Sequence, residues 1–230
     1  MSESYPHEDG VVEVHMPSGA VTRIPTLCIC QVREIYSWKV YNHHLSIEDL
    51  KDKIVFDIGA MAGVYSIMAA YAGASQVYAV EPNKANYALL QENVTLNKLT
   101  NITTLPMAIS NQDNVEVKLF NHPRPGSHSI TRFTDVKNFD MIPAITLDSM
   151  ASEFKVTPDF IKMDIEGAEH IAMSGAKRLL QEGKTEFAIA TYHGDKIHDI
   201  VVDHFEHFDY EVDVQGSGGQ GGRFVHAWKD

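Results

Sequence analysis

Hydrophobic positions along the chain alternate between short apolar runs and longer stretches with helical spacing. The run at residues 54–58 is followed by an apolar segment with few breakers at 64–71, which predicts a strand, a glycine turn and a helix. Further strands are predicted at 76–81, 102–105, 159–165 and 186–191, and further helices at 83–97, 147–154, 166–180 and 193–205. Strands that alternate with helices predict a mostly parallel sheet with helices on both faces.

The two ends of the chain fall outside this alternation. At the N-terminal end the pattern predicts a hairpin of 11–16 and 20–25, a strand at 27–32 and a short capped helix at 46–50. Since no linker separates residues 1–50 from 51–230, the first fifty residues are expected to cover the sheet as part of one unit. At the C-terminal end, two closing strands at 210–214 and 223–228 flank the glycine-rich loop 216–222, which no helix follows. That loop is therefore predicted to be a hairpin tip and not a phosphate cradle.

Residues 114–146 are interpreted as an insertion. Residues 114–120 alternate apolar and polar side chains, as a half-exposed strand does, and 121–129 are rich in turn formers. Together with 130–133 and 142–146 they predict an inserted β-hairpin or lid-like segment. Because loops of this kind often carry specificity, His128 is a candidate contact to a substrate.

Composition and charge narrow the classes of protein. With 230 residues, 44% hydrophobic and 22% charged, the chain has the composition of a soluble globular domain. Its net charge of −12 disfavours a nucleic-acid partner, because a phosphate backbone requires a basic face. The N-terminus lacks the pattern of a signal peptide, and no apolar run approaches the ~18 residues of a membrane helix. We therefore expect a cytoplasmic protein without a membrane partner.

The two cysteines, Cys28 and Cys30, stand two residues apart on a predicted strand. Side chains at that spacing share one face of the strand, where a disulfide would be strained. Reduced thiols are one interpretation. Half of a metal site is the other, although no second thiol pair completes it.

The turn after the first strand predicts the kind of cofactor. Gly59 and Gly63 stand four positions apart, and glycine lets a ligand lie against bare backbone. In a dinucleotide fingerprint a glycine would stand where Met61 does, and Asp57 would repel a diphosphate. S-adenosylmethionine carries an ammonium and a sulfonium, and Asp57 can attract the ammonium directly or through water. The turn therefore favours S-adenosylmethionine over a nicotinamide dinucleotide.

Residues at the ends of the predicted strands are expected to form one crevice, because ligands of open α/β sheets bind beyond the carboxyl ends of the strands. Glu81 ends the second strand, ~20 residues after Gly59, where an acid accepts hydrogen bonds from a ribose diol. The full set is Asp57, Glu81, Met107, Ala108, Asp164 and Thr191 to His193.

Four motifs, in this order and spacing, resemble the FkbM family of S-adenosylmethionine-dependent class I methyltransferases. They are DIGAMAG at 57–63, VEPN at 80–83, TLDSM at 146–150 and IKMDIEGAE at 161–169, and the resemblance covers about residues 33–214. It implies a Rossmann-like, doubly wound sheet of seven strands in the order 3-2-1-4-5-7-6. The N-terminal β/α elaboration and the inserted β-hairpin would be additions to that α/β fold.

The resemblance also implies cofactor-binding residues. The methionine end of the cofactor would lie at Asp57, Gly59, Ala60 and Gly63, the ribose at Glu81, Pro82 and Asn83, and the adenine side at Met107 and Ala108. Many relatives place a glutamate two residues before the histidine that follows the fifth strand. Here that stretch reads Thr191-Tyr192-His193.

Three residues are candidates for catalysis. His193 is the candidate general base, because an imidazole titrates near neutrality; a hydrogen-bonded histidine at a helix start is the structural alternative. Asp164 is interpreted as an acid that faces the substrate or the cofactor ammonium, as a ligand of a divalent cation, or as a helix cap. Glu166 either belongs to the same site or stabilises the N-terminus of the next helix by interacting with its dipole.

The sequence therefore predicts an S-adenosylmethionine-dependent methyltransferase acting on a hydroxyl of a small molecule or glycan. A protein or lipid amine stays open as the acceptor, and neither oligomeric state nor metal dependence is fixed by the sequence. Two alternatives remain: a nicotinamide-dependent oxidoreductase, and a subunit that binds S-adenosylmethionine without turnover.

Overall fold

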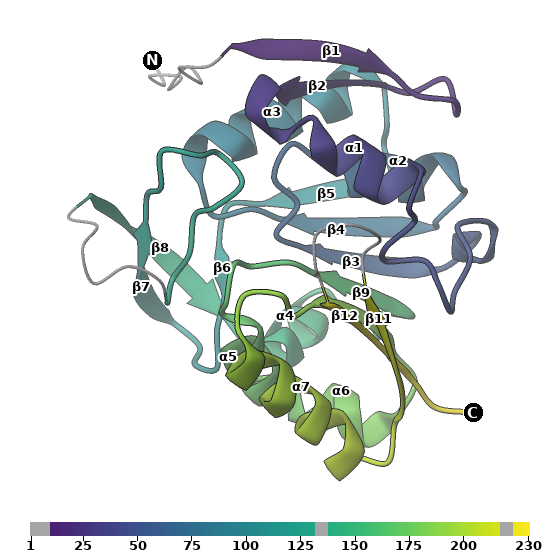
Figure 1. The fold of residues 1–230 in the computed structure, drawn as a ribbon, viewed down its shortest axis with the longest axis vertical. Coiled ribbons are helices and arrows are strands. Elements are labelled where there is room, and N and C mark those ends of the chain that lie inside the picture. The colour runs from purple at the N-terminus through teal and green to yellow at the C-terminus, as the bar shows by residue number, and fades with distance from the viewer. Residues whose placement is uncertain (1–9, 132–137, 217–222) are drawn as a thin grey trace.

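The computed structural model describes residues 10–131, 138–216 and 223–230, which are built around a central seven-stranded sheet (Figure 1). Across the sheet, the strands are β5 (Ile102–Leu105), β4 (Gln76–Val80), β3 (Ile54–Ile58), β9 (Phe160–Met163), β10 (Glu186–Ala190), β12 (Arg223–Trp228) and β11 (Glu211–Gly216). Strand β12 is antiparallel to both neighbours, and the other adjacent pairs are parallel. Numbered by their succession within this sheet, the strands run 3-2-1-4-5-7-6. The mostly parallel sheet predicted from the alternating pattern is confirmed.

Helices cover both faces of the sheet, as predicted. One face carries α1 (Cys30–Tyr36), α2 (Val64–Tyr71) and α3 (Lys84–Leu96), and the other carries α4 (Leu147–Glu153), α5 (Glu169–Ser174), α6 (Lys177–Glu182) and α7 (Asp195–His207) (Figure 1). Successive side chains of a strand point to opposite faces of the sheet, so each strand contributes side chains to the hydrophobic cores on both faces. In β3, Val55 packs into the first core and Phe56 into the second.

The N-terminal segment is tied to helix α3 by asparagine side chains. It folds as β1 (Val11–His15), β2 (Val21–Pro25), a 3-10 turn at Thr26–Cys28, and α1, which confirms the predicted hairpin. Asn93 accepts a hydrogen bond from the backbone N–H of Arg23 (2.8 Å) and donates one to its carbonyl (2.7 Å). Asn97 makes the same pair of bonds with Val21. These amides complete the edge of β2 as another strand would.

The strand predicted at 27–32 is wrong, because this stretch turns into a helix. Cys28 and Ile35 are its buried positions, and their separation of about seven residues corresponds to two helical turns. The cysteines therefore share no strand face: Cys28 is buried, Cys30 is exposed, and both thiols are free.

The single helix predicted at 166–180 is also wrong. Glu166 and Gly167 both have positive φ, so the helix starts only at Glu169. A second break follows at Gly175, where an added Cβ would lie 2.6 Å from the carbonyl oxygen of Ser110. Helix α6 then begins with its free N–H groups bonded to the carboxylate of Asp148, which belongs to α4. That cap comes from about thirty residues away, where a local pattern cannot reveal it.

The insertion forms a second, three-stranded sheet in the order β6-β8-β7. Its strands are β6 (Ala108–Ile109), β7 (Val115–Phe120) and β8 (Phe139–Ile145). The inserted hairpin expected from the sequence corresponds to β7 and β8, which pair antiparallel. Residues 106–110, which lie between the strand predicted at 102–105 and the insertion, contain β6, which pairs parallel with β8. The strand expected at 130–133 and the glycine loop at 216–222 both extend beyond the described residues.

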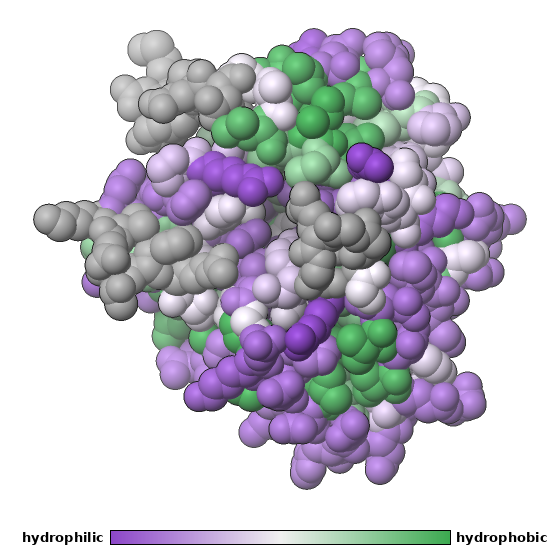
Figure 2. Space-filling view, in the orientation of Figure 1, coloured by the Kyte–Doolittle hydropathy of each residue, from purple (hydrophilic) through white to green (hydrophobic). Residues whose placement is uncertain are grey.

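Polar side chains cover most of the face shown in Figure 2, and hydrophobic ones gather at the top, over elements near the N-terminus. Within the described residues, no helix is both long enough and apolar enough to cross a membrane.

Candidate active site

The glycines of the turn after β3 are required by packing inside the protein. Gly59 and Gly63 both have positive φ, as does Met61 between them. A Cβ on Gly59 would lie 1.9 Å from the carbonyl oxygen of Asp164, and one on Gly63 would lie 2.4 Å from Leu90. Contacts with Asp164 after β9 and with helix α3 therefore leave no room for a side chain at either glycine.

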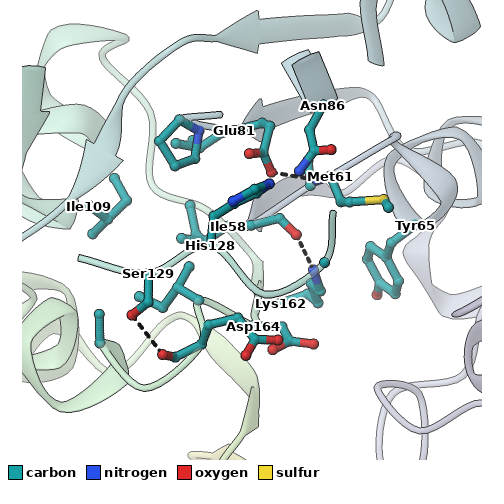
Figure 3. A pocket seen from close by; sticks show the side chains of 18 of the residues that line it. Ile58, Met61, Tyr65, Glu81, Asn86, Ile109, His128, Ser129, Lys162 and Asp164 are labelled. Atoms are coloured by element: carbon teal, nitrogen blue, oxygen red, sulfur yellow. Dashed lines mark hydrogen bonds between the residues drawn. The ribbon is translucent and has the colours of Figure 1, made fainter. Parts of the chain in front are cut away.

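A cavity of about 890 Å³, including its open mouth, lies at the carboxyl ends of β3, β4 and β9 (Figure 3). Nine of the residues proposed from the sequence line it: Gly59, Ala60, Glu81, Pro82, Met107, Ala108, His128, Asp164 and Glu166. Asp57, Gly63, Asn83 and His193 are not among its lining residues.

Glu81 ends β4 inside the cavity and is held by backbone donors. Its two oxygens accept hydrogen bonds from the N–H groups of Met61 and Asn83, each at 2.8 Å. Burial raises the pKa of Glu81 to about 7, against the lowering effect of these two donors. A carboxyl group with such a pKa gains or loses its charge near neutral pH.

Asp57 does not face the cavity, in contrast to the sequence expectation. It is fully buried, with Oδ1 3.0 Å from Nζ of Lys162 and Oδ2 accepting a hydrogen bond from the Ser66 hydroxyl (2.6 Å). Lys162 lines the cavity and also donates to the carbonyl of Gly59 at 2.8 Å. The sequence did contain a signal for it, because a lysine inside a buried strand requires a buried partner.

Asn83 caps helix α3. Its side-chain oxygen accepts hydrogen bonds from the N–H groups of Ala85 and Asn86, and its amide donates to Asn121 in the insertion at 3.3 Å. These contacts satisfy two of the free donors at the helix start. A cap therefore accounts for Asn83 without a cofactor.

Asp164 and Glu166 form an acidic wall with His193 packed behind it. Nε2 of His193 lies 3.6 Å from Asp164 Oδ1 and 3.5 Å from Glu166 Oε2, and Nδ1 lies 3.2 Å from Glu169 Oε1. Burial alone would lower the pKa of His193, but its bonds to Glu166 and Glu169 and the charge of Asp164 raise it to about 10. The imidazole is therefore protonated at neutral pH. One oxygen or nitrogen from each of Asp164, Glu166 and His193 lies within 4.8 Å of the others, a grouping that can hold a metal ion.

Two tyrosines fix the orientation of Asp164. The hydroxyls of Tyr41 and Tyr192 donate to its Oδ2, at 2.8 and 3.1 Å. Burial and the nearby Asp164 charge raise the pKa of both hydroxyls well above the usual range, so both stay protonated. Thr191, placed in the crevice by the sequence, is buried and bonds to His198 instead.

The remaining wall comes from segments that the sequence could not place. Glu34 of α1 lines the cavity, as do Pro125, His128 and Ser129 of the insertion. The Ser129 hydroxyl donates to the carbonyl of Glu166 at 2.7 Å, so the insertion is joined to the acidic wall (Figure 3). Residues of the insertion thus line the same cavity as Glu81 and Asp164, and the contact of His128 with a substrate stays a prediction.

Comparison with known proteins identifies the family. A family model described as the Methyltransferase FkbM domain matches residues 57–212, more than half of the chain. The chain belongs to the FkbM methyltransferase family. The matched region includes the glycine turn, Glu81 and the acidic wall.

Solved structures of other methyltransferases share the fold of this FkbM family member. The crystal structure of methyltransferase FkbM from Methylobacillus flagellatus KT superimposes with a TM-score of 0.59 and 21% identity, over 76% of this chain and 43% of that one. M. jannaschii TYW2, solved in complex with AdoMet, gives a TM-score of 0.51 and 17% identity, over 96% of this chain and 86% of that one. At these identities the likeness concerns the fold.

Among curated proteins, histone-arginine methyltransferase CARMER from Anopheles gambiae is 46% identical over 66 residues. That match spans 28% of this chain and 10% of CARMER. This FkbM family chain thus corresponds to a small part of that relative and to less than half of the Methylobacillus protein.

Proposed function

We propose that the chain is an S-adenosylmethionine-dependent methyltransferase that modifies a hydroxyl of a small molecule or glycan. The observation that carries the proposal is the charge of the cavity. Its charged lining among the described residues consists of four carboxylates, Glu34, Glu81, Asp164 and Glu166, and one lysine that is already paired with Asp57. Such a lining repels the diphosphate of a nicotinamide dinucleotide and suits a cofactor with a sulfonium and an ammonium.

The residues present fit this cofactor. Glu81 offers carboxylate oxygens for a ribose diol, with Pro82 beside it, and Met107 and Ala108 supply an apolar surface for an adenine ring. Gly59 and Ala60 face the same space, where the methionine end would lie. Lys162 lines the same space while paired with Asp57, so Asp57 supports this end of the cavity from behind the lining.

When bound, S-adenosylmethionine would supply the methyl group, with its sulfur as the leaving group. The acceptor hydroxyl would pass its proton to a carboxylate of the acidic wall, Asp164 or Glu166, both of which line the cavity. His193 is already protonated and its side chain is only 2% exposed, so we assign it a positioning role in place of general base.

The experiment that tests the cofactor is equilibrium dialysis of the purified chain against S-adenosylmethionine and, separately, NAD. We expect saturable binding of S-adenosylmethionine at about one per chain and none of NAD. Retention of NAD alone would overturn the proposal and favour the oxidoreductase.

The experiment that tests the reaction is transfer of labelled methyl from S-adenosylmethionine to a panel of polyols, glycans, phenols and amines. Labelled hydroxyl acceptors would support the proposal, and labelled amines would redirect it to N-methylation. Cofactor binding with no product from any class would favour a binding subunit without turnover.

A further inference from the structure

We propose that Asp164, Glu166 and His193 bind a divalent cation, Mg²⁺ or Mn²⁺, at the acidic wall of the cavity, with positions left open for an acceptor oxygen. The cation site stands on the geometry of these residues. Its use in holding the acceptor rests on the proposed methyl transfer, and the two parts are tested separately below.

The distances suit one shared ion. Nε2 of His193 lies 3.6 Å from Asp164 Oδ1 and 3.5 Å from Glu166 Oε2. Neighbouring ligands of an octahedral ion at about 2.1 Å stand roughly 3 Å apart. Each carboxylate oxygen is therefore within about half an ångström of the spacing from Nε2 that a shared ion requires, and one ligand atom from each of the three residues lies within 4.8 Å of the others. Mn²⁺ accepts two carboxylate oxygens and an imidazole nitrogen as ligands. Mg²⁺ also accepts the two carboxylate oxygens.

Asp164 presents one buried oxygen that accepts no hydrogen bond. Its Oδ2 accepts hydrogen bonds from the hydroxyls of Tyr41 and Tyr192, whereas Oδ1 is buried and has no hydrogen-bond partner. This second oxygen is the one that faces His193. A buried carboxylate oxygen without a donor is costly, and a cation beside it removes that cost.

Glu169 orients His193 as metal-binding histidines are oriented. Its side chain is fully buried, and Oε1 accepts hydrogen bonds from the N–H groups of Ile165 and Gly167. The same oxygen lies 3.2 Å from Nδ1 of His193. With the Nδ1 proton directed at this carboxylate, Nε2 becomes the ligand once the bound ion displaces the proton that Nε2 carries, which gives the usual carboxylate–histidine–metal arrangement.

The proposed cation site faces the cavity. Asp164 and Glu166 line the cavity, so an ion held by them would have its remaining positions on that side. The lysine nearest in the lining, Lys162, is paired with Asp57 and leaves the negative charge of this wall in place. An ion here would compensate that charge and orient an acceptor oxygen.

Manganese binding measured by electron paramagnetic resonance tests the site directly. The full chain, freed of metal and without cofactor, is titrated with Mn²⁺, and we expect about one bound ion per chain that Mg²⁺ displaces. Glu166→Gln should weaken Mn²⁺ binding at least 10-fold, and Glu169→Gln should weaken it about 10- to 100-fold. Glu92→Gln, which removes a charge from an exposed position of α3 outside the cavity, is the control and should change affinity less than 3-fold.

Absence of a bound ion at millimolar Mn²⁺, or equal binding by Glu166→Gln and the parent chain, would overturn the site. Because Glu169 is fully buried, the folding of its variant is checked by circular dichroism. If that variant is unfolded, Glu166→Gln decides alone, since its side chain is partly exposed.

Calorimetry with S-adenosylmethionine in the presence of EDTA separates the two proposals. Mn²⁺ binding without cofactor binding would support the cation site and overturn the methyltransferase. Methyl transfer that proceeds in EDTA with an unchanged KM for the acceptor would support the proposed methyltransferase activity. It would overturn the role of the cation in holding the acceptor. With the role we infer, EDTA raises the acceptor KM at least 10-fold while cofactor affinity stays the same.

Discussion

The two sides of the cavity are built in different ways. The side formed by Glu81 joins groups from consecutive elements: the turn after β3 and the end of β4 meet through the bond from Met61 N–H to Glu81. The side formed by Asp164 joins Tyr41, Ser129 and Tyr192 from three distant segments. Figure 3 shows Glu81 and Asp164 on opposite sides, with Lys162 between them.

This difference predicts which substitutions alter cofactor affinity and which alter the acceptor step. A buried acid held by backbone N–H groups keeps its place whatever the neighbouring side chains are. An acid oriented by other side chains depends on each of them. We therefore expect changes at the Glu81 side to alter cofactor affinity alone, and changes at the Asp164 side to alter the acceptor step.

The largest effect is expected at Lys162, which joins the two sides. Lys162→Met leaves Asp57 buried without its partner, and loss of one member of a buried ion pair costs about 3–5 kcal/mol. Urea denaturation measures it. The double variant Asp57→Asn, Lys162→Met should recover much of this loss, because no lone charge remains. A loss under about 1 kcal/mol in the single variant would show that the pair does not hold the two sides together.

Gly59→Ala should destabilise the protein by about 2–4 kcal/mol. The added Cβ meets the Asp164 carbonyl, which adds overpacking to the strain of a positive φ. Gly19→Ala is the matched control, since Gly19 also has positive φ but nothing lies within 4 Å of its added Cβ. The control should lose about 1–2 kcal/mol. Equal losses in both variants would mean that the turn does not pack tightly on β9.

Glu81→Ala should weaken S-adenosylmethionine binding about 10- to 150-fold, as expected for loss of a charge-assisted hydrogen bond of about 1.5–3 kcal/mol. Isothermal titration calorimetry measures it. Glu92→Gln, which changes an exposed carboxyl group of α3 outside the cavity, should bind the cofactor normally. Unchanged affinity in Glu81→Ala would remove Glu81 from the cofactor site.

Cofactor affinity should rise with pH through the pKa of Glu81, which is about 7. The carboxylate is the form that accepts two ribose hydroxyls, so protonation below pH 7 competes with binding, and binding releases a proton. We expect affinity to fall about 10-fold between pH 8 and pH 6 and the profile to flatten in Glu81→Gln. A pH-independent parent chain would contradict the assignment.

The smallest effect is expected at Asn83. Asn83→Ala removes the cap of α3 and should cost about 1 kcal/mol of stability, whereas Asn83→Ser, which keeps a capping oxygen, should cost less. Thermal unfolding compares them. A large loss of cofactor affinity in Asn83→Ser would instead give Asn83 a direct contact with the cofactor.

Sequence patterns predicted the elements that hold the Glu81 side of the cavity. They failed where contacts between distant segments determine the structure. Strand β3, helix α2 and the position of Glu81 followed from hydrophobic period and glycine spacing. The break at Gly175 did not, because the reason for it is the carbonyl of Ser110. The burial of Asp57 was missed for a similar reason, since its partner Lys162 lies about one hundred residues away.

By itself the sequence determined the alternating α/β pattern, the acidic glycine turn and the family to which the chain belongs. Each of these depends on residues that are close together in the sequence, because such residues set the hydrophobic period, the conformation of the turn and the family motifs. Only the tertiary structure decided that His193 is surrounded by three carboxylates and that Asp164 is aimed by two tyrosines. The charge of a buried group is set by what packs around it, and those neighbours come from parts of the chain that folding alone brings together.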